Sequence, residues 1–521
     1  MAAAKIKILL LNSPVLAVIE PWFDAPEFVR TSLAVLAGYL RKYTDYEICC
    51  LDAKFEKLTM QQTVAKVIEI NPDYIGFTAF TNEIKPSAYL AGLIKKELPN
   101  VVTIIGGAHI TAIPESTLKE FPTFDFGIFG EGEITLKELI DALVNNETLN
   151  RIDGVVFRQN NLIVKNKERN RILEQDTLPM PAWDLLPPAK EYYIQTVRGC
   201  PFACVFCLNH NGKIARKRNA EITVEEMEWL IDYVKPERIS FGDELFSIDM
   251  KRTEELLDLM IERKIGERVS WDIQTHVGYV NDVLFEKMKK ANIAKCEMGV
   301  EAGDPIALKK MGKGTNMEMI MKAFKSAKKY NIPTGSFLLL GQPNETHQSI
   351  WNTLKVGIKI NPTEPIIGTM VPYPGTEVAK MAALGEAGYK LITTNWDEYR
   401  KQLNGSLEFT NISRRALEFY QAFGYIIIFI ANFRFLDFIK FFIKYIGGAV
   451  QLVKKIFSGK KGTEEMMNIP DDYDTIINSP ENISLEEIID ARTYWKKVQA
   501  DEIKRTKQLS PNLLEEQLPV M

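Results

Sequence analysis

Three cysteines occupy one short run of the chain, Arg198-Gly199-Cys200-Pro201-Phe202-Ala203-Cys204-Val205-Phe206-Cys207, with the spacing Cys-x-x-x-Cys-x-x-Cys. Iron-sulfur cubes usually bind four cysteine thiolates. The other cysteines of the chain, Cys49, Cys50 and Cys296, are distant in sequence. Three thiolates would leave one iron of a cube without a protein ligand, and such an iron can bind a small molecule. The spacing therefore predicts chemistry rather than electron storage.

The alternatives to an iron-sulfur cube are a structural zinc site and a chance cluster of cysteines. Zinc sites usually combine two Cys-x-x-Cys pairs or add histidines at a fixed spacing. His210 is the only histidine near the run, and the sequence has no second pair. The motif therefore favours the iron-sulfur cube.

The run resembles the signature of the radical S-adenosylmethionine (SAM) enzymes, including the Gly199-Cys200 pair and Phe206 between the last two cysteines. The resemblance implies that Cys200, Cys204 and Cys207 bind a [4Fe-4S] cluster and that Phe206 contacts SAM. It implies that the open iron takes the amino and carboxylate groups of SAM, and that an electron from the cluster cleaves SAM to a 5′-deoxyadenosyl radical. It also implies an electron donor such as flavodoxin or ferredoxin.

Alternating strands and helices must position this run. The expected strands are 193–197, 238–241, 269–273, 294–300, 335–340 and 366–371, and the expected helices are 224–234, 253–263, 283–291, 317–330 and 348–360. Six strand–helix repeats fit a partial α/β barrel, the TIM-like (β/α)6 core that the resemblance implies. Active sites of barrels lie at the carboxyl ends of the strands. The loops after these strands are therefore the candidate site.

Five further loops follow the strands in the family's order. They are Gly242-Asp243-Glu244, Gln274-Thr275-His276, 299–303, 341–346 and 372–376. The resemblance implies SAM contacts by Gly242, Asp243, Glu244, His276, Glu301 and Gln342. Each loop taken singly also fits ordinary strand-to-helix turn chemistry.

His276 departs from the family pattern, because relatives often have arginine at its position. A histidine can donate one hydrogen bond to a carboxylate but cannot form the bidentate pair of an arginine. A contact of His276 with the SAM carboxylate and a contact with the substrate therefore both stay open.

The first 145 residues alternate in the same way. The expected strands are 6–11, 47–51, 74–78, 101–105 and 124–129, and the expected helices are 32–43, 60–70, 85–98 and 134–144. Short, fully apolar strands between helices predict a doubly wound, Rossmann-like parallel sheet. Ligands of such sheets bind beyond the carboxyl ends of the strands.

Polar and glycine-rich loops follow these strands, and they resemble those of the cobalamin-binding domain of cobalamin-dependent radical SAM enzymes. The resemblance implies cobalamin contacts by Asn12, Ser13, Pro14, Thr81, Asn82, Glu83, Gly106, Gly107, His109, Gly130, Glu131 and Gly132. The Asp-x-His-x-x-Gly motif, whose histidine binds cobalt in many cobalamin mutases, is absent from residues 1–145. A domain that keeps the fold without the cofactor is therefore the alternative, and His109 can equally be a loop residue with a local hydrogen bond.

The sequence predicts four regions. Residues 1–145 form the cobalamin-binding domain, 146–190 a linker with a small hairpin turning at Asn160-Asn161, 191–384 the radical SAM barrel, and 385–521 a mainly helical C-terminal region. The polar tail from Lys497 is expected to be loosely ordered.

Residues 417–461 hold the most apolar stretch of the chain, followed by lysines. One interpretation is a helical cap packed on the barrel; the other is peripheral contact with a membrane. The membrane interpretation would favour a lipid-like substrate over another small molecule.

Composition is that of an ordinary globular protein, with 46% hydrophobic and 25% charged residues. A net charge of −4 gives no reason to expect a nucleic-acid partner. No apolar stretch reaches the roughly 20 residues of a membrane span. An oxygen-labile cluster favours a location in the cytoplasm. The membrane interpretation of residues 417–461 would add association with a membrane.

The combined expectation is a cobalamin-dependent radical SAM enzyme, which the resemblance identifies most closely with methyltransferases that alkylate an unactivated carbon through methylcobalamin. A radical SAM cyclase or rearrangement enzyme that uses cobalamin without methyl transfer is the first alternative. Methylthio transfer would need cysteines for a second cluster, and only Cys49 and Cys50 are available in the first domain. A non-catalytic cobalamin or redox sensor is the alternative from another class.

Overall fold

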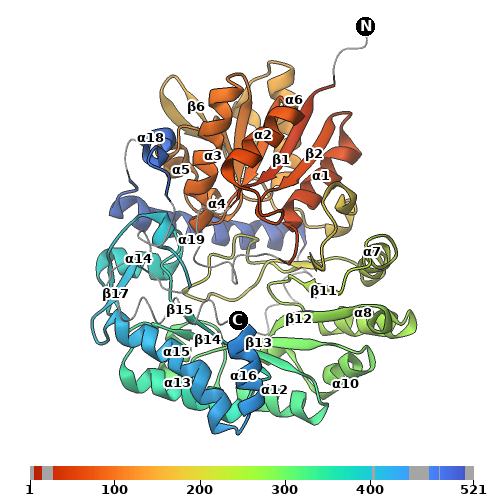
Figure 1. Ribbon diagram of the computed structural model, residues 1–521, viewed down its shortest axis with the longest axis vertical. Coiled ribbons are helices and arrows are strands. Elements are labelled where there is room, and N and C mark those ends of the chain that lie inside the picture. The colour runs from red at the N-terminus through yellow and green to blue at the C-terminus, as the bar shows by residue number, and fades with distance from the viewer. Residues whose placement is uncertain (1–4, 15–26, 402–404, 445–468, 480–481, 511–521) are drawn as a thin grey trace. The chain divides into compact units, whose positions relative to one another are not determined.

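The computed structural model describes residues 5–14, 27–401, 405–444, 469–479 and 482–510 (Figure 1). The chain divides into two compact units. The sheet unit comprises Met1–Ala189, Thr394–Tyr399 and Thr463–Ala500, and the barrel unit comprises Lys190–Thr393, Arg400–Gly462 and Asp501–Met521. The C-terminal region expected from the sequence is thus divided between the two units, and the four predicted boundaries stay a prediction.

The sheet unit is built on a seven-stranded sheet of order β2-β1-β3-β4-β5-β6-β7. Its parallel strands are β1 (Lys7–Asn12), β2 (Glu47–Asp52), β3 (Tyr74–Thr78), β4 (Val102–Gly106) and β5 (Phe126–Ile128). The hairpin of β6 (Val155–Gln159) and β7 (Leu162–Lys165) continues the sheet in antiparallel fashion. It turns at Asn160 and Asn161, which both have positive φ, as a tight primed turn requires.

Helices cover both faces of this sheet, as Figure 1 shows in red and orange. They are α1 (Thr31–Tyr43), α2 (Met60–Ile70), α3 (Ile84–Glu97), α4 (Ala108–Ala112), α5 (Pro114–Glu120) and α6 (Gly132–Val144). α1 packs with α6, and α2 packs with α3. The strand order 2-1-3-4-5 places the topological switch point between β1 and β3, where doubly wound sheets bind their ligands.

The barrel unit is built on a six-stranded parallel sheet of order β15-β14-β13-β12-β11-β8. The strands are β8 (Glu191–Ile194), β11 (Arg238–Phe241), β12 (Ser270–His276), β13 (Lys295–Glu301), β14 (Thr334–Leu340) and β15 (Glu364–Thr369). Adjacent pairs are parallel, and no pairing joins β8 to β15 among the described residues. The predicted partial barrel is confirmed.

The helices of the barrel unit follow their strands with short caps. They are α7 (Ala220–Tyr233), α8 (Met250–Glu262), α9 (Ile265–Arg268), α10 (Asp282–Lys290), α11 (Pro305–Lys310), α12 (Met317–Lys329), α13 (His347–Ile360) and α14 (Glu377–Leu384). All but α9 begin after an Asn, Asp or Thr whose side chain accepts a backbone N–H of the first turn. Such caps fix where each loop ends and each helix begins.

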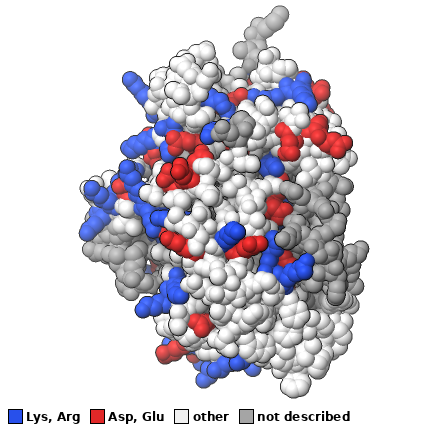
Figure 2. Space-filling model, turned by 90° about the vertical axis from the view of Figure 1, so that its left-hand side faces the viewer, with Lys and Arg blue, Asp and Glu red and all other residues white. Residues whose placement is uncertain are grey.

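The C-terminal part of the barrel unit is mainly helical, as expected. It contains α15 (Arg414–Ala431) and α16 (Phe435–Lys444), preceded by the two-stranded ribbon of β16 (Tyr389–Leu391) and β17 (Leu407–Phe409). Figure 2 shows broad uncharged areas on the surface of this unit, in the lower part of the view. Residues 445–461 of the apolar and basic stretch lie outside the described residues.

The expectation of a loosely ordered tail from Lys497 is wrong as far as Leu509, because α19 (Leu485–Leu509) includes this part. Residues 511–521 of the tail lie outside the described residues. Ile488, Ala491 and Trp495 recur at helical spacing and are buried. The Trp495 indole N–H donates to the Ala112 carbonyl at 3.0 Å, within the sheet unit. The shorter α18 (Tyr473–Ile477) packs against α3 in the same unit. Tertiary anchoring of a narrow apolar stripe therefore orders a polar segment.

Short elements complete the described residues. One-turn 3-10 helices lie at Thr81–Glu83, Leu149–Arg151, Gln175–Thr177, Trp183–Leu185, Val277–Tyr279 and Trp396–Glu398, and a two-stranded ribbon pairs β9 (Val197–Arg198) with β10 (Arg216–Lys217).

Candidate functional site: the cysteine loop and its surroundings

The cysteine run lies in a loop that the β9–β10 ribbon closes at its base. Gly199 begins the loop with φ +93°, and a Cβ there would lie 2.2 Å from the Ile214 carbonyl oxygen. The Cys200 backbone N–H donates to the Gly212 carbonyl at 3.1 Å. Only glycine fits the position before the first cysteine, which gives the Gly-Cys pair a steric reason.

Asn209 braces the loop from within. Its side-chain amide donates to the carbonyl oxygens of Cys200 at 3.2 Å and Phe202 at 2.8 Å. Its amide oxygen accepts the Cys207 thiol at 2.9 Å. One buried side chain therefore links the first and last cysteines of the run, and the sequence reasoning did not identify it.

Burial raises the pKa of all three cysteine thiols, and that of Cys200 to about 12. Lysines oppose this effect: Lys213 lowers the pKa of Cys200 and Cys207, Lys313 that of Cys204, and Lys401 that of Cys207. Thiolates bind metals, so neighbouring cations favour the form that a cluster needs. The environment therefore offers three partly buried sulfurs and compensating positive charge.

These sulfurs suit a cube better than a single ion. Among the described residues, no set of three or more His, Cys, Asp and Glu side chains converges closely enough to hold one metal ion. The cysteines nevertheless influence one another electrostatically. In a cube each thiolate binds a different iron, so its ligands stand further apart than those of a mononuclear zinc site. The donor set fits the iron-sulfur cube.

Gly242, Asp243 and Glu244 follow β11, and the structure separates their tasks. The Gly242 N–H donates to the Ile194 carbonyl at 2.8 Å. The Asp243 carboxylate accepts the Thr196 N–H at 2.6 Å, the Val197 N–H at 2.8 Å and the Thr196 hydroxyl at 2.7 Å. Burial still raises its pKa to about 6. Asp243 therefore holds the start of the cysteine loop.

Glu244 has one carboxylate oxygen that is available. Its Oε1 accepts the Asn211 side-chain amide, whereas the buried Oε2 has no hydrogen-bond partner within the described part of the chain. Burial raises the pKa of Glu244 above its ordinary value. An unpaired buried acceptor costs free energy until a donor arrives. Of this loop, Glu244 is the side chain best placed to receive a ligand.

Both ring nitrogens of His276 are already engaged. Nδ1 accepts the Gly278 N–H at 3.0 Å, so the protonated Nε2 donates to the Lys313 carbonyl at 3.1 Å. The ring stacks on Phe202 of the cysteine loop, with centroids 4.4 Å apart. Burial and Lys313 lower its pKa to about 4. His276 is thus a neutral residue that ties the Lys313 loop to the cysteine loop.

The loop Gly312-Lys313-Gly314 packs directly on the cysteine run. The Val205 N–H donates to the Met311 carbonyl at 3.0 Å, and a Cβ at Gly312 would lie 2.7 Å from the Ala203 carbonyl oxygen. The Lys313 ammonium pairs with Glu301 and lies where a Cβ on Gly299 would project. Gly299 is the β13 neighbour of His276. The sequence reasoning missed Lys313, for which two flanking glycines were the available signal.

Glu301 ends β13 in a strained conformation. It has φ +62° and lies at a register shift between β13 and β14. The Gln342 amide donates to its carbonyl oxygen at 3.1 Å, and Gln342 Oε1 is buried without a partner among the described residues. Strain of this kind in a non-glycine residue points to a functional position. The predicted residues Glu301 and Gln342 therefore lie together.

Phe206 has a packing role in the same loop. It and Val205 pack against the apolar cluster of Met370, Val378 and Tyr389. The Val378 N–H donates to the Val205 carbonyl at 3.1 Å. The aromatic ring between the last two cysteines is therefore an anchor of the loop.

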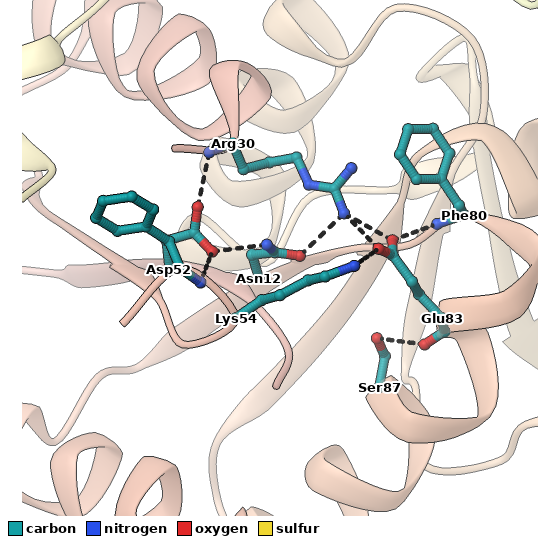
Figure 3. Close-up of polar contacts among 8 residues, drawn as sticks. Asn12, Arg30, Asp52, Lys54, Phe80, Glu83 and Ser87 are labelled. Atoms are coloured by element: carbon teal, nitrogen blue, oxygen red, sulfur yellow. Dashed lines mark hydrogen bonds and ion pairs between the residues drawn. The ribbon is translucent and has the colours of Figure 1, made fainter. Parts of the chain in front are cut away.

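A network of charged and polar side chains fills the carboxyl edge of the sheet unit near the switch point (Figure 3). Arg30 donates to the Asn12 amide oxygen at 3.2 Å and pairs with the Glu83 carboxylate at 2.7 Å. The Asn12 amide donates to Asp52 at 2.7 Å, and Lys54 pairs with Glu83 at 3.1 Å. Asn12 and Glu83, both predicted cobalamin contacts, are thus engaged with their neighbours.

Burial alone would raise the pKa of Glu83, but Arg30, Lys54 and the Phe80 N–H outweigh it and hold the pKa below its usual range. Ser13 follows Asn12 and has a buried hydroxyl without a partner in the described residues. Pro14 is buried as well, and Asn82 is half-buried. Arg30 and Lys54, which hold this edge together, were not identified from the sequence.

The glycine loops of the sheet unit meet at the same edge. Gly107 has φ +103°, and a Cβ there would lie 2.7 Å from the Ala79 carbonyl oxygen. Gly106 accepts the Ala79 N–H at 3.1 Å, and the Gly130 N–H donates to the Thr111 hydroxyl at 3.1 Å. The loops after β3, β4 and β5 are therefore linked by hydrogen bonds, and the close approach of the first two requires glycine at position 107.

His109, Thr81 and Glu131 face inward. His109 Nδ1 and the Thr81 hydroxyl are 3.3 Å apart, and the His109 ring meets Trp396 edge-on at 4.9 Å. Burial lowers the His109 pKa to about 3, so the ring is neutral, and its Nε2 has no partner in the residues described. Glu131 accepts the Ile172 N–H at 2.9 Å, and Gly132 begins α6. The donors and small residues at this edge are compatible with a large bound cofactor.

Two family models match the chain in regions that correspond to the two sheets. The B12 binding domain matches residues 27–140, and the radical SAM superfamily matches residues 194–356. The second match contains the cysteine run, Glu244, His276, Glu301, Lys313 and Gln342.

Two relatives that are similar in sequence and one solved structure that is similar in fold agree with these matches. An uncharacterized methyltransferase of Pyrococcus horikoshii is 32% identical over 70% of this chain and 80% of its own length. The anaerobic magnesium-protoporphyrin IX monomethyl ester cyclase of Rubrivivax gelatinosus is 28% identical over 70% of this chain and 68% of its own. The cobalamin-dependent radical enzyme OxsB, solved with aqua-cobalamin, has the same fold: TM-score 0.68, 18% identity, 97% of this chain and 81% of that chain.

Proposed function

The chain belongs to the radical SAM enzymes that carry a B12-binding domain, and from this membership we propose that it methylates an unactivated carbon of its substrate. The [4Fe-4S] cluster and SAM follow from the radical SAM membership, and cobalamin from the B12-binding domain. The observation that carries the proposal is the three-cysteine loop of the barrel, in a chain that also matches the B12-binding domain. A relative that is 32% identical is named as a methyltransferase. When bound, the cluster supplies the electron that cleaves SAM and the corrinoid supplies the methyl group.

The assignment of Cys200, Cys204 and Cys207 as cluster ligands rests on their common loop and on the lysine beside each thiol. Asn209 and Gly199 hold the loop in the shape that presents the three sulfurs. Phe206 anchors the loop to the barrel by packing against its apolar cluster.

We assign Glu244 to the amino group of SAM. Its buried Oε2 accepts no hydrogen bond from the described residues and would gain a donor from an ammonium group. Asp243 and Gly242 then act as positioning residues, because their polar atoms are committed to Thr196, Val197 and Ile194.

We assign Lys313 to the carboxylate of SAM, at the place where His276 lacks a free donor. A lysine ammonium has three donors, and the pair with Glu301 uses only part of them. His276 itself binds no part of SAM. Its Nε2–H donates to the Lys313 carbonyl and so orients the loop. Glu301 and Gln342 contribute acceptor oxygens that suit ribose hydroxyls, and Gln342 Oε1 has no partner within the described residues.

We assign the carboxyl edge of the sheet unit to cobalamin. The support is the family-model match over residues 27–140, the switch point between β1 and β3, and the free Ser13 hydroxyl. Asn12, Glu83 and Glu131 would act by shaping this edge, because internal partners already engage their side chains. Residues 15–26, which follow Pro14, lie outside the described residues.

A cyclase or rearrangement enzyme is the second candidate, and the 28% identity to the Rubrivivax cyclase is the observation that favours it. Both candidates take a small-molecule substrate and need an electron donor. A non-catalytic sensor would need neither, and the intact Glu244, Lys313 and Glu301 surroundings argue against it.

Product analysis separates these functions. The protein, reconstituted with iron, sulfide and cobalamin, is incubated with SAM and a reductant without oxygen. We expect both 5′-deoxyadenosine and S-adenosylhomocysteine. 5′-Deoxyadenosine without S-adenosylhomocysteine would favour the cyclase, and the absence of both products would favour the sensor.

A further inference from the structure

An apolar surface runs along α15 and α16 of the barrel unit. On α15, the exposed side chains Phe419, Ile426 and Ile430 recur at helical spacing, and Phe433 follows with 83% of its surface exposed. The Phe433 and Phe435 rings, 6.5 Å apart, connect this stripe to α16. The exposed apolar residues of α16 are Phe435, Leu436, Ile439, Phe442 and Ile443.

These exposed residues are not needed to pack the helices. α15 attaches to the barrel through its other face, where the Gln421 amide donates to the Ile367 carbonyl at 2.8 Å and Gly424 lies against Ile367. α16 attaches to α15 through Phe441, whose ring lies 5.0 Å from that of Tyr425. Leu436 and Ile443 nevertheless remain 75% and 65% exposed. A contiguous exposed apolar patch of this kind marks an interaction surface.

Lysine outnumbers acidic residues in α16 and in the sequence that follows it. The only acidic residue of α16, Asp437, is paired with Arg434 at 2.8 Å. Lys440 is exposed beside the apolar surface of α16. In sequence, residues 438–463 hold six lysines and no aspartate or glutamate; the lysines are Lys440, Lys444, Lys454, Lys455, Lys460 and Lys461. In the sequence, α16 is therefore followed by a strongly basic segment.

An exposed apolar arc flanked by lysine suits the interface of an anionic bilayer. Apolar side chains enter the headgroup boundary, and each lysine near the surface adds electrostatic attraction. No helix in the described ranges is long and apolar enough to span a bilayer. We propose that the apolar surface of α15 and α16 docks the protein onto the surface of an anionic lipid bilayer. A purely apolar protein partner would not account for the excess of lysine in α16 and the sequence after it.

Vesicle flotation tests this proposal without any cofactor, so its outcome is independent of the proposed catalytic function. The full-length protein is mixed with vesicles of phosphatidylcholine alone or of phosphatidylcholine with phosphatidylglycerol. We expect flotation with the anionic vesicles and its loss at high salt, because charge supplies part of the attraction. Lys440→Gln should weaken partitioning about fivefold.

The triple variant Leu436→Ser, Ile439→Ser and Ile443→Ser removes the centre of the arc and should weaken partitioning by at least about tenfold. The matched control Val283→Ser with Ile306→Ser changes exposed apolar residues elsewhere in the barrel unit and should float like the unaltered protein. Circular dichroism checks that each variant is folded. Failure of the unaltered protein to float, or equal flotation of the triple variant and the control, overturns the proposal. A dimer that the triple variant dissociates, with no flotation, assigns the surface to a second copy of the chain instead.

Discussion

The side chains nearest the cysteines divide into those that hold the loop and those left to receive a ligand. Asn209, Asp243 and His276 have their polar atoms committed within the protein. Glu244 and Lys313 keep capacity to bind. The sequence predicted the cysteines, because their spacing alone carries the signal. It could not show which of the other side chains is available to a ligand, because a carboxylate that has internal hydrogen bonds and one that lacks them look alike in sequence.

Lys313→Met tests the assignment of the SAM carboxylate. Loss of a hydrogen-bonded charge costs about 1.5–3 kcal/mol, which corresponds to roughly 10- to 100-fold weaker SAM binding. Lys313→Arg keeps a positive charge beside Cys204 and should therefore retain the iron content and part of the SAM affinity. Isothermal titration of SAM into the anaerobically reconstituted protein measures the effect, with the exposed Lys310→Met as control. Unchanged SAM affinity in Lys313→Met would remove Lys313 from the site.

Glu83→Gln tests the buried network of the sheet unit. The change leaves Arg30 and Lys54 without their carboxylate and should lower the free energy of unfolding by about 3–5 kcal/mol at neutral pH. The pKa of Glu83 is lowered in the folded protein. Its stabilisation is therefore complete above the ordinary carboxyl pKa and is lost as the pH falls through the lowered value.

Urea unfolding at neutral and acidic pH measures this difference. Wild type and Glu83→Gln should converge as the pH falls, because protonated glutamate and glutamine are then similar. The exposed Glu97→Gln on α3 is the control and should behave like wild type at both pH values. A constant gap between wild type and Glu83→Gln across pH would contradict the ion-pair account.

The central strands of the two sheets and the helices between them matched the sequence prediction closely, since apolar runs and 3.6-residue periodicity mark them directly. Tyr74–Thr78, Met60–Ile70 and Arg238–Phe241 occur with the predicted bounds. α4 and α5 were missed because they are one or two turns long within a loop. α19 was missed because its buried stripe is narrow and its other faces are polar.

The last turns of α19 support the cysteine loop within the barrel unit. The Glu502 carboxylate accepts the N–H groups of Lys213 at 2.9 Å and Ile214 at 3.4 Å. Gly212, next to them, accepts the Cys200 N–H. Glu502→Ala should loosen this support by about 1.5–3 kcal/mol and so lower the iron retained per chain.

Iron and sulfide analysis after reconstitution, followed by brief exposure to air, measures the effect of Glu502→Ala. The exposed Lys504→Ala on the same helix is the control and should retain a normal cluster. Equal iron retention by both variants would show that α19 does not support the cluster loop.

At the scale of the whole molecule, the chain joins two α/β units that match different cofactor families. The order of the strand-end loops, rather than any single loop, made this predictable from the sequence. The substrate was not predictable, because nothing in the apolar α15 and α16 or in the barrel loops has a motif tied to one compound. The exposed apolar surface of α15 and α16 is the part of the molecule that we propose docks onto a lipid bilayer.

The transfer of label from SAM tests the central claim most directly. The protein is reconstituted with its cluster and cobalamin, reduced without oxygen and given SAM with a deuterated methyl group. We predict labelled methyl on the protein-bound corrinoid and 5′-deoxyadenosine in solution, with Cys200→Ala losing the 5′-deoxyadenosine. A corrinoid that stays unlabelled while 5′-deoxyadenosine accumulates would contradict methyl transfer, and a protein that yields neither product would contradict the radical SAM assignment itself.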